Sequence, residues 1–474
     1  MLQQTTYLQR AGATFLALIN DLKRNEASAA RDLGVSEDLI HEIVAGEHPI
    51  SREILDKAVK IWPVNERDFF PIHDDVSEGV VVMDKSQSVA SSRVLQRAGR
   101  DYYEYRDTAM SRVAMIRPEW IKMLQIVHDN DPENPNVEWN NGHFLFQFTY
   151  FVGEVNYYYE WNGRKFCEPM NTGDSVFGLP FAKHSFGSRN PQSPALILAL
   201  TYGGRLAGDA QHELGILGDE SACKYVLPMD DQIGAHSALL RFHVANGSYS
   251  CDYLAAAAGI KKARLKKALS GEVALAAHEL QSLADTLRVP VRDLLVPQLD
   301  TNNGVVIVHH KDAPSWVLPN EEQPSYRMRE LAGSRVTPYS KSVEIEVLPQ
   351  AGKPHPLETG THQYGYNLGP APVTLGWTCD GARHSKVVQP EESFFIKPHI
   401  AHWFESLEPT RLLLLRVGGK IVGDALLEAS IVGKESLSRV VAETMCWYNE
   451  EGSHHNDHAT EPGPVLAGAA AAVR

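Results

Sequence analysis

Apolar residues divide the chain into two kinds of segment that alternate along it. In the first kind they recur at intervals of three and four residues, as at Ile40, Ile43 and Val44, which places them on one face of a helix. The second kind follows the first and consists of short alternating or aromatic-rich runs that Gly, Pro and Asn interrupt. Such runs are typical of β-strands joined by turns. The pattern therefore predicts helical segments that each precede an all-β segment.

The pattern of the helical segment occurs twice. Leu33-Gly34-Val35 corresponds to Ala258-Gly259-Ile260, and Ala45-Gly46-Glu47 corresponds to Ser270-Gly271-Glu272, at a constant offset of 225 residues. Self-similarity at one fixed offset indicates a repeated structural unit. Each copy is therefore predicted to be a small helical bundle with a helix-turn-helix element.

The β segments repeat as well. Pro180 leading to His184 matches Pro398 leading to His402 at an offset of 218 residues. This proline-to-histidine spacing is close to the second half-motif of cupin barrels, and Gly142-His143 resembles the first half-motif. We therefore expect each β segment to form a cupin barrel, which is a double-stranded β-helix.

The repeats together predict an α+β fold, in which a helix-turn-helix-like domain precedes a cupin barrel in each half of the chain. The end of the chain is rich in Ala, Gly and His, has no periodicity and is predicted to be disordered. The expected domains are a helical domain at 1–75, a first barrel at 76–235, a second helical domain at 236–300, a second barrel at 301–450 and a tail at 451–474.

Three side chains of the first barrel have the spacing of a metal-binding set. Side chains at i and i+4 of a strand share a face, so His143 and Gln147 are expected to meet His184 from a neighbouring strand. Most iron oxygenases with two histidines have a carboxylate where this chain has an amide. The rival carboxylates are Glu154 and Glu160, which lie an odd number of residues from His143 and face away unless a bulge changes the register.

The second barrel retains only part of this set. His362 and His402 are expected at the positions of the two histidines, and Tyr366 stands four residues after the first of them. Two imidazoles without a third donor make a poor iron site. We therefore predict one metal site per chain, with a structural or interface role for a degenerate second barrel.

The charge of the chain argues against polyanionic partners. Its 474 residues carry a formal net charge of −14, which disfavours nucleic acid and anionic membranes. A ligand-sensing transcription regulator is an alternative, because many regulators join a helix-turn-helix to a cupin. The first bundle lacks a basic stripe and is instead acidic at Glu37, Asp38, Glu42 and Glu47.

The remaining composition indicates the compartment. A membrane span needs about 18 consecutive apolar residues, which occur nowhere in the chain. The five cysteines form no CxxC pair, which argues against a disulfide framework and fits a reducing compartment. We expect a cytoplasmic protein that forms a homo-oligomer, although no residue pattern indicates the number of subunits.

The motifs in combination resemble a known enzyme family. Asn140-Asn141-Gly142-His143, Gln96-Arg97-Ala98-Gly99 before an aromatic run, and Pro180 leading to His184 are similar to the motifs of the hydroxyethylphosphonate dioxygenase and methylphosphonate synthase family. The likeness spans most of the chain outside its two ends. It implies a mononuclear non-haem iron(II) enzyme that cleaves the carbon–carbon bond of 2-hydroxyethylphosphonate with dioxygen and no reducing cosubstrate.

The resemblance also implies a role for individual residues. His143 and His184 fall on the iron-binding histidines of the family, and a phosphonate dianion needs cationic and hydroxyl donors around it. The residues that fall on substrate-binding positions are Lys23, Arg97, Tyr105, Asn140 and His184, of which Lys23 and Tyr105 are expected to be catalytic.

The third ligand distinguishes two branches of this family. The dioxygenase has a Glu six residues before its last histidine, whereas the synthase has a Gln four residues after its first. This chain has Gly178 at the former place and Gln147 at the latter, so it resembles the synthase, although a residue larger than Gly178 is expected there. The implied products are methylphosphonate and carbon dioxide or bicarbonate. The alternative within the family is hydroxymethylphosphonate and formate.

Overall fold

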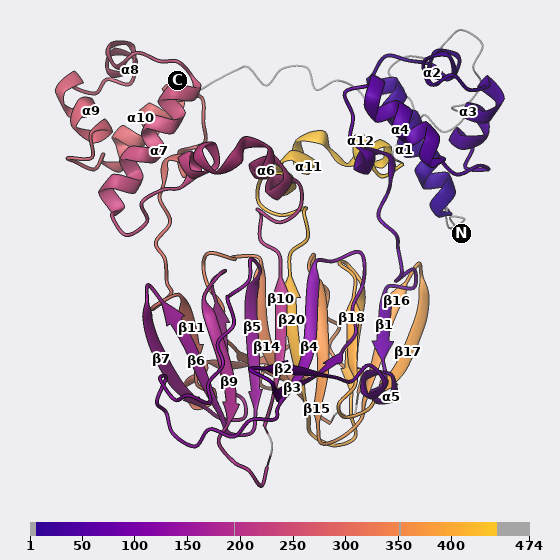
Figure 1. Cartoon of the computed structure of the whole chain (residues 1–474), viewed down its shortest axis with the longest axis vertical. Helices are drawn as coiled ribbons and strands as arrows, with labels where there is room; N and C mark the ends of the chain where they lie inside the picture. Colours follow the sequence, from indigo (N-terminus) through magenta and orange to yellow (C-terminus); the bar gives the residue numbers. More distant parts are fainter. Residues whose placement is uncertain (1–5, 194, 350–351, 443–474) are drawn as a thin grey trace. The chain divides into compact units, whose positions relative to one another are not determined.

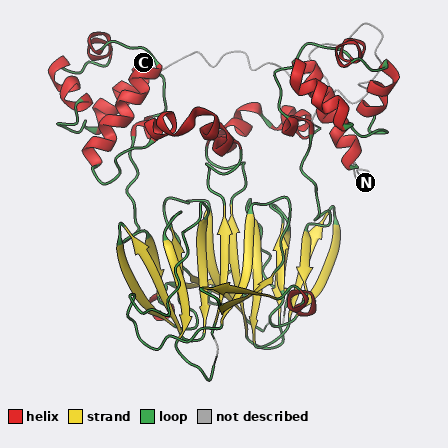
Figure 2. Ribbon diagram, in the orientation of Figure 1, coloured by secondary structure: helices red, strands yellow, loops and turns green. Residues whose placement is uncertain are grey.

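The structure of the chain is a computed structural model that describes residues 6–193, 195–349 and 352–442. The predicted tail at 451–474 lies outside the described residues. The chain forms two compact units, the first consisting of Met1–His73 with Gly423–Arg474 and the second of Asp74–Val422. Helices and antiparallel sheets both occur, as Figure 2 shows in red and yellow, so the predicted α+β class is confirmed.

The first unit is helical. Its helices are α1 (Tyr7–Asp21), α2 (Glu26–Leu33), α3 (Glu37–Val44), α4 (Arg52–Ile61), η1 (Glu66–Phe69), α11 (Asp424–Val432) and α12 (Lys434–Val441). Polar caps define where α2 and α3 begin. The side chains of Asn25 and Ser36 each accept a hydrogen bond from the backbone N–H of the residue three positions later. Ile40 and Ile43 are buried, as the helical spacing predicts.

A second bundle with the same local structure lies within the second unit. It comprises α7 (Gln232–Asn246), α8 (Cys251–Ala257), α9 (Lys262–Leu269), α10 (Ala277–Leu287) and η3 (Val291–Leu294), preceded by α6 (Asp209–Ala222) and η2 (Cys223–Tyr225). Lys23 and Ser248, which correspond at the offset of 225, both have a left-handed backbone, with φ of 60° and 53°. Within the described residues, no helix is long and apolar enough to cross a bilayer.

Ten strands form two facing sheets that we call the first sheet pair. The seven-stranded sheet has the order β11 (Val305–Val308), β8 (Ser175–Gly178), β5 (Phe146–Val152), β10 (Leu196–Tyr202), β4 (Ile116–Met123), β3 (Arg100–Asp107) and β2 (Arg93–Arg97). The three-stranded sheet has the order β7 (Arg164–Met170), β6 (Val155–Trp161) and β9 (Lys183–Ser188). Buried residues such as Phe151, Tyr157 and Ile197 pack between the two sheets.

The second sheet pair repeats this arrangement. Its seven-stranded sheet has the order β1 (Val80–Met83), β18 (Ser393–Ile396), β15 (His362–Gly369), β20 (Thr410–Val417), β14 (Ser340–Val347), β13 (Tyr326–Glu330) and β12 (Ser315–Leu318). Its three-stranded sheet has the order β17 (Ala382–Val388), β16 (Val373–Cys379) and β19 (Ala401–Glu405). The short elements α5 (Lys85–Ala90) and η4 (His310–Asp312) connect strands.

The two sheet pairs exchange one edge strand each. β1 precedes the first sheet pair in sequence but pairs with β18 of the second, and β11 precedes the second but pairs with β8 of the first (Figure 1). Reciprocal hydrogen bonds accompany the exchange, because Ser393 Oγ accepts from the Ala109 N–H and Ser175 Oγ accepts from the Ala332 N–H. The predicted ranges 76–235 and 301–450 each therefore contain a strand that belongs to the sheet of the other half.

The two seven-stranded sheets share a core that contains a buried carboxylate. Glu344 on β14 is 4% exposed, accepts a 2.5 Å hydrogen bond from the Tyr150 hydroxyl on β5, and lies 3.1 Å from His310 Nε2. Arg329 and Arg411 lie within 4 Å of it. The carboxylate thus compensates two cations and links both halves of the second unit.

We expect Glu344→Gln to lower the free energy of unfolding by about 1–3 kcal/mol, because the variant retains the volume but leaves buried donors without their charged partner. Urea titration followed by circular dichroism measures the change. The matched control is Glu346→Gln on the same strand, which removes a surface ion pair with Arg327 and is expected to cost about 0–1 kcal/mol. Equal losses in both variants would contradict the prediction.

Candidate metal centre

Two histidines of the first sheet pair are held in the tautomer that binds metals. His143 precedes β5 and its Nδ1 lies 2.9 Å from the Leu145 carbonyl oxygen, while His184 begins β9 and its Nδ1 lies 2.9 Å from the Ala182 carbonyl oxygen. A carbonyl oxygen can only accept, so each Nδ1 carries the proton. In the neutral form of either ring, Nε2 therefore carries the lone pair. The ring centroids are 5.3 Å apart.

Gln147 on β5 supplies a third donor atom beside His143. Its Oε1 lies 2.8 Å from His143 Nε2, and its Nε2 donates to Thr149 Oγ1 at 2.8 Å. In this orientation the amide oxygen faces the histidine. An unprotonated Nε2 and an amide oxygen would then face each other with lone pairs only. A metal ion coordinated by both atoms would satisfy them, so the residues fit a metal ion.

The environment of His184 keeps this side chain neutral. Burial lowers its pKa to about 4, although the hydrogen bond to the Ala182 carbonyl opposes the shift. His143 and Arg97 lower the pKa further because both carry or can carry positive charge. At neutral pH the imidazole is therefore unprotonated at Nε2, which is the form that binds a metal.

Asn140 points an amide N–H toward the same place. Its Oδ1 accepts hydrogen bonds from the backbone N–H groups of Gly142 and His184, at 3.0 and 2.8 Å. Because the oxygen is held by the backbone, Nδ2 faces His184 Nε2 at 3.0 Å. With His184 Nε2 unprotonated, this N–H donates to its lone pair. A metal ion bound at Nε2 would take that lone pair and leave the Asn140 N–H to donate to a group beside it.

Arg97 and Tyr105 lie on the neighbouring strands β2 and β3. The Arg97 guanidinium donates to the Glu138 carbonyl at 2.7 Å and lies 4.8 Å from the centroid of the Tyr103 ring. Burial raises the pKa of the Tyr105 hydroxyl, and Arg97, which is hydrogen-bonded to it, opposes the shift. The site thus combines a fixed cation with a protonated hydroxyl donor.

The remaining candidates are Lys23 and the two rival carboxylates. Lys23 lies in the first unit, in the turn after α1, so its contact with substrate stays a prediction. The side chain of Glu160 forms a 2.9 Å ion pair with Lys183, and Glu154 is exposed in the turn between β5 and β6. Glu160 thus has another charged partner and Glu154 lies at the surface, while the choice of Gln147 as the third ligand stays a prediction.

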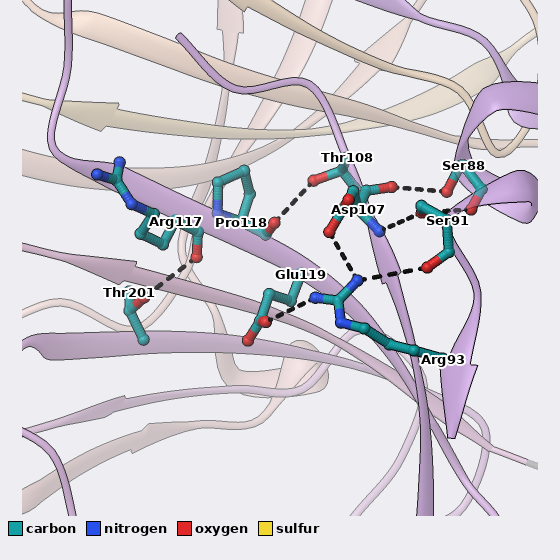
Figure 3. Close-up of polar contacts among 9 residues, drawn as sticks. All are labelled: Ser88, Ser91, Arg93, Asp107, Thr108, Arg117, Pro118, Glu119 and Thr201. Carbon is teal, nitrogen blue, oxygen red and sulfur yellow. Dashed lines mark hydrogen bonds and ion pairs between the residues drawn. The ribbon is translucent and has the colours of Figure 1, made fainter. Parts of the chain in front are cut away.

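A charged cluster on the same sheet was missed by sequence reasoning. Arg93 donates to Asp107 at 2.7 Å and lies 3.5 Å from Glu119, as Figure 3 shows. Burial raises the pKa of Glu119, and the nearby Arg93 and His143 oppose the shift. The cluster also contacts the substrate-binding candidates, because Arg93 lies 5.8 Å from the centroid of the Tyr105 ring. Asp107 and Glu119 are twelve residues apart in sequence and lie opposite each other only because β3 pairs with β4, so no local motif identifies them.

The prediction for the second sheet pair needs a correction. His362 corresponds to Phe146 and not to His143. The His362 ring stacks on Phe395 with centroids 5.8 Å apart, just as the Phe146 ring stacks on Phe177, the counterpart of Phe395, with centroids 5.7 Å apart. Tyr366 belongs to the core between the seven-stranded sheets and not to the interior of the second sheet pair. The similarity at the proline-to-histidine motif does not continue at the same offset into β15.

Comparison with known proteins finds relatives that cover nearly the whole chain. No protein-family model matches the chain. The methylphosphonate synthase of Nitrosopumilus maritimus (strain SCM1) is 41% identical over 451 residues, which cover 95% of this chain and 98% of that protein. The solved structure of Streptomyces albus hydroxyethylphosphonate dioxygenase, with 2-hydroxyethylphosphonate and Fe(II) bound, has a TM-score of 0.89 and 43% identity, covering 93% of this chain and 99% of that one.

A more distant structure shares the fold. PhpD with cadmium, complexed with hydroethylphosphonate, has a TM-score of 0.70 and 17% identity over 92% of this chain and the whole of that chain. The class that the fold, the site and these relatives define is that of the non-haem iron oxygenases. The chain belongs to the family of methylphosphonate synthase and hydroxyethylphosphonate dioxygenase.

Proposed function

We propose that the protein is an Fe(II)-dependent oxygenase that cleaves the carbon–carbon bond of 2-hydroxyethylphosphonate with dioxygen. The products are methylphosphonate and carbon dioxide or bicarbonate. The observation that carries the proposal is the 2.8 Å approach of His143 Nε2 to Gln147 Oε1, beside a His184 ring whose centroid lies 5.3 Å from that of His143. Both Nδ1 atoms lie against backbone carbonyls. The 41% identity to a methylphosphonate synthase supports it.

The three proposed ligands are all neutral, which affects the substrate. A metal ion without a carboxylate ligand retains one more unit of positive charge than a two-histidine-one-carboxylate site. Fe(II) held there would bind the substrate hydroxyl and dioxygen and acidify the hydroxyl. The amide ligand therefore favours binding of the dianionic substrate.

The remaining residues are proposed to hold the phosphonate. Arg97 supplies a charge-assisted hydrogen bond, Tyr105 supplies a hydroxyl, and Asn140 supplies the amide N–H that its backbone contacts direct into the site. Lys23 is proposed as a further cation for the same group. With its oxygens held, the substrate can rotate little, so the hydroxyl end stays at the metal.

A single-turnover experiment tests the proposed function. The enzyme is loaded with Fe(II) without air, mixed with 2-hydroxyethylphosphonate, and exposed to dioxygen, and phosphorus NMR identifies the products. Methylphosphonate as the main product supports the proposal. Recovery of unchanged substrate from iron-loaded, folded enzyme contradicts it.

Hydroxymethylphosphonate and formate form the second candidate product set. The 43% identity to a hydroxyethylphosphonate dioxygenase favours it, since it is as high as the identity to the synthase. Gly178 lies opposite Gln147 in the strand ladder and would leave room for a Cβ atom, whose nearest neighbour would be the Gln147 carbonyl at 3.9 Å. The same NMR experiment separates the two product sets.

We expect Arg97→Ala to raise the KM for 2-hydroxyethylphosphonate by well over tenfold. Removing one charged partner of a desolvated contact costs about 2–5 kcal/mol, and about 1.4 kcal/mol corresponds to a factor of ten. Steady-state kinetics and iron analysis measure the effect, and iron content should stay near that of the parent. Arg100→Ala is the matched control, because Arg100 pairs with Glu138 and Asn136. A parental KM in Arg97→Ala would exclude its proposed role.

The finer features of the fold are also proposals. We propose that each sheet pair is a cupin barrel and that α2 with α3 and α8 with α9 are helix-turn-helix elements without a DNA-binding role. The four cysteines among the described residues are free, which supports a reducing cytoplasm as the place of action. Light scattering after size exclusion tests the expected homo-oligomer.

A further inference from the structure

The strand ladders identify which residue of the second sheet pair corresponds to Gln147. Gln147 on β5 lies opposite Gly178 on β8 and Thr201 on β10. On β15 the residue at the corresponding ladder position is Gln363, which lies opposite Ile396 on β18 and Arg416 on β20. The second sheet pair therefore retains the proposed amide ligand. An arginine, Arg416, stands where the first pair has Thr201.

The loop before each strand identifies the counterpart of His143. The His143 carbonyl accepts a 2.8 Å hydrogen bond from the Phe181 N–H, and the Thr359 carbonyl accepts a 2.8 Å hydrogen bond from the His399 N–H. Phe181 and His399 share a left-handed backbone, with φ of 63° and 59°. Thr359 therefore occupies the place of His143.

The counterpart of His184 is retained with its tautomer. His402 Nδ1 lies 2.8 Å from the Ile400 carbonyl oxygen, which repeats the contact of His184 with Ala182. The His402 side chain is wholly buried, and its Nε2 has no hydrogen-bond partner. A buried lone pair without a donor is uncommon, because it forfeits the hydrogen bonds that it made in water. Two of the three proposed donor groups are thus present in the second sheet pair.

Arg416 contacts the Gln363 amide and, in addition to burial, its positive charge lowers the pKa of His402. Its Nε–H donates to Gln363 Oε1 at 3.0 Å, whereas the corresponding oxygen of Gln147 faces His143 Nε2. Burial lowers the pKa of Arg416, but a guanidinium stays charged in proteins. The amide oxygen that faces a proposed metal position in one half therefore faces a side-chain cation in the other.

We propose that the second sheet pair contains a latent metal site, in which Arg416 supplies the positive charge that a metal ion supplies in the first. Replacing Thr359 with His and Arg416 with Thr would open this site to a divalent transition-metal ion held by two imidazoles and an amide oxygen. The inference rests on the proposed function, because it takes His143, Gln147 and His184 as the metal ligands of the first pair.

Cobalt binding tests the proposal, because Co(II) accepts imidazole and amide donors and absorbs visible light. The full chain is compared as parent, Thr359→His, Arg416→Thr and the double variant, with metal content measured after gel filtration. We expect about one Co(II) per chain in the parent and in both single variants, and about two in the double variant. Adding Gln363→Ala to the double variant should return the content to about one.

Each outcome bears on the proposal in a defined way. About one Co(II) in a folded double variant overturns it, and so does about two in Thr359→His alone, since Arg416 would then not block the site. If the parent binds no Co(II), the proposed function fails, while a gain of one ion in the double variant still supports the latent site. If the double variant unfolds without metal, refolding with Co(II) present should restore its thermal transition, because a ligand of the native state stabilises it. No restoration counts against the proposal.

Discussion

The His184→Ala variant is expected to lose Fe(II) binding and turnover together, with iron affinity lower by at least about 100-fold. Outer contacts of a metal ligand alone are commonly worth about 10–100-fold in affinity, and this substitution removes a proposed ligand. His184 is also placed beside Asn140, so its loss disturbs the proposed phosphonate position. Iron analysis after gel filtration and phosphorus NMR of the reaction measure the two losses.

His402→Ala is the matched control for this variant. His402 has the same backbone position and the same Nδ1 contact in the second sheet pair. Its replacement is expected to leave iron content and the product unchanged per folded molecule, whatever it does to the thermal midpoint. Full activity in His184→Ala, or loss of iron in His402→Ala, would show that the metal lies elsewhere.

We expect the two substitutions of Gln147 to have different results. Gln147→Ala leaves two histidines, which hold Fe(II) poorly, so the variant should lose most of its iron. Gln147→Glu retains a donor oxygen but adds a negative charge to the metal, which weakens its pull on the substrate hydroxyl. This variant should bind Fe(II), yet turn over more slowly or form part of its product as hydroxymethylphosphonate. Iron analysis and phosphorus NMR distinguish the cases.

The control for Gln147→Ala is Gln363→Ala, which removes the corresponding amide of the second sheet pair. It should retain the iron content of the parent. The competing model is a two-histidine-one-carboxylate site. That model would gain support if Gln147→Ala kept its iron while Glu154→Ala or Glu160→Ala lost it.

Local patterns predicted the features that depend on neighbours in sequence. The spacing of Ile40 and Ile43 predicted a buried helix face, and the i, i+4 spacing of His143 and Gln147 predicted that both side chains meet. The parity argument also placed Glu160 away from His143, since β6 turns this side chain toward Lys183. The buried helix face follows from periodicity alone. His143 lies before β5 and not in it, so its contact with Gln147 also depends on the bend at residues 144–145.

Features that depend on strand pairing could not be predicted in this way. The repeat has an offset of 218 at the proline-to-histidine motif but 216 between Gln147 and Gln363. The predicted match of His362 to His143 and of Tyr366 to Gln147 assumed an offset of 219 and is therefore wrong. A loop that differs by two residues changes the register without leaving a motif. The cluster of Arg93, Asp107 and Glu119 was missed for the same reason, because three strands bring it together.

The exchange of β1 and β11 bears on how this protein could change over time. In a repeat protein whose halves each complete their own sheets, one half can be deleted without exposing a sheet edge of the other. Here, deletion of the second half would also remove β11 and expose the edge of β8, which carries Gly178 opposite Gln147. The exchange of strands therefore makes the two halves mutually dependent. If only the first half holds the metal, as we propose, the exchange offers a physical reason why the second half of the repeat persists.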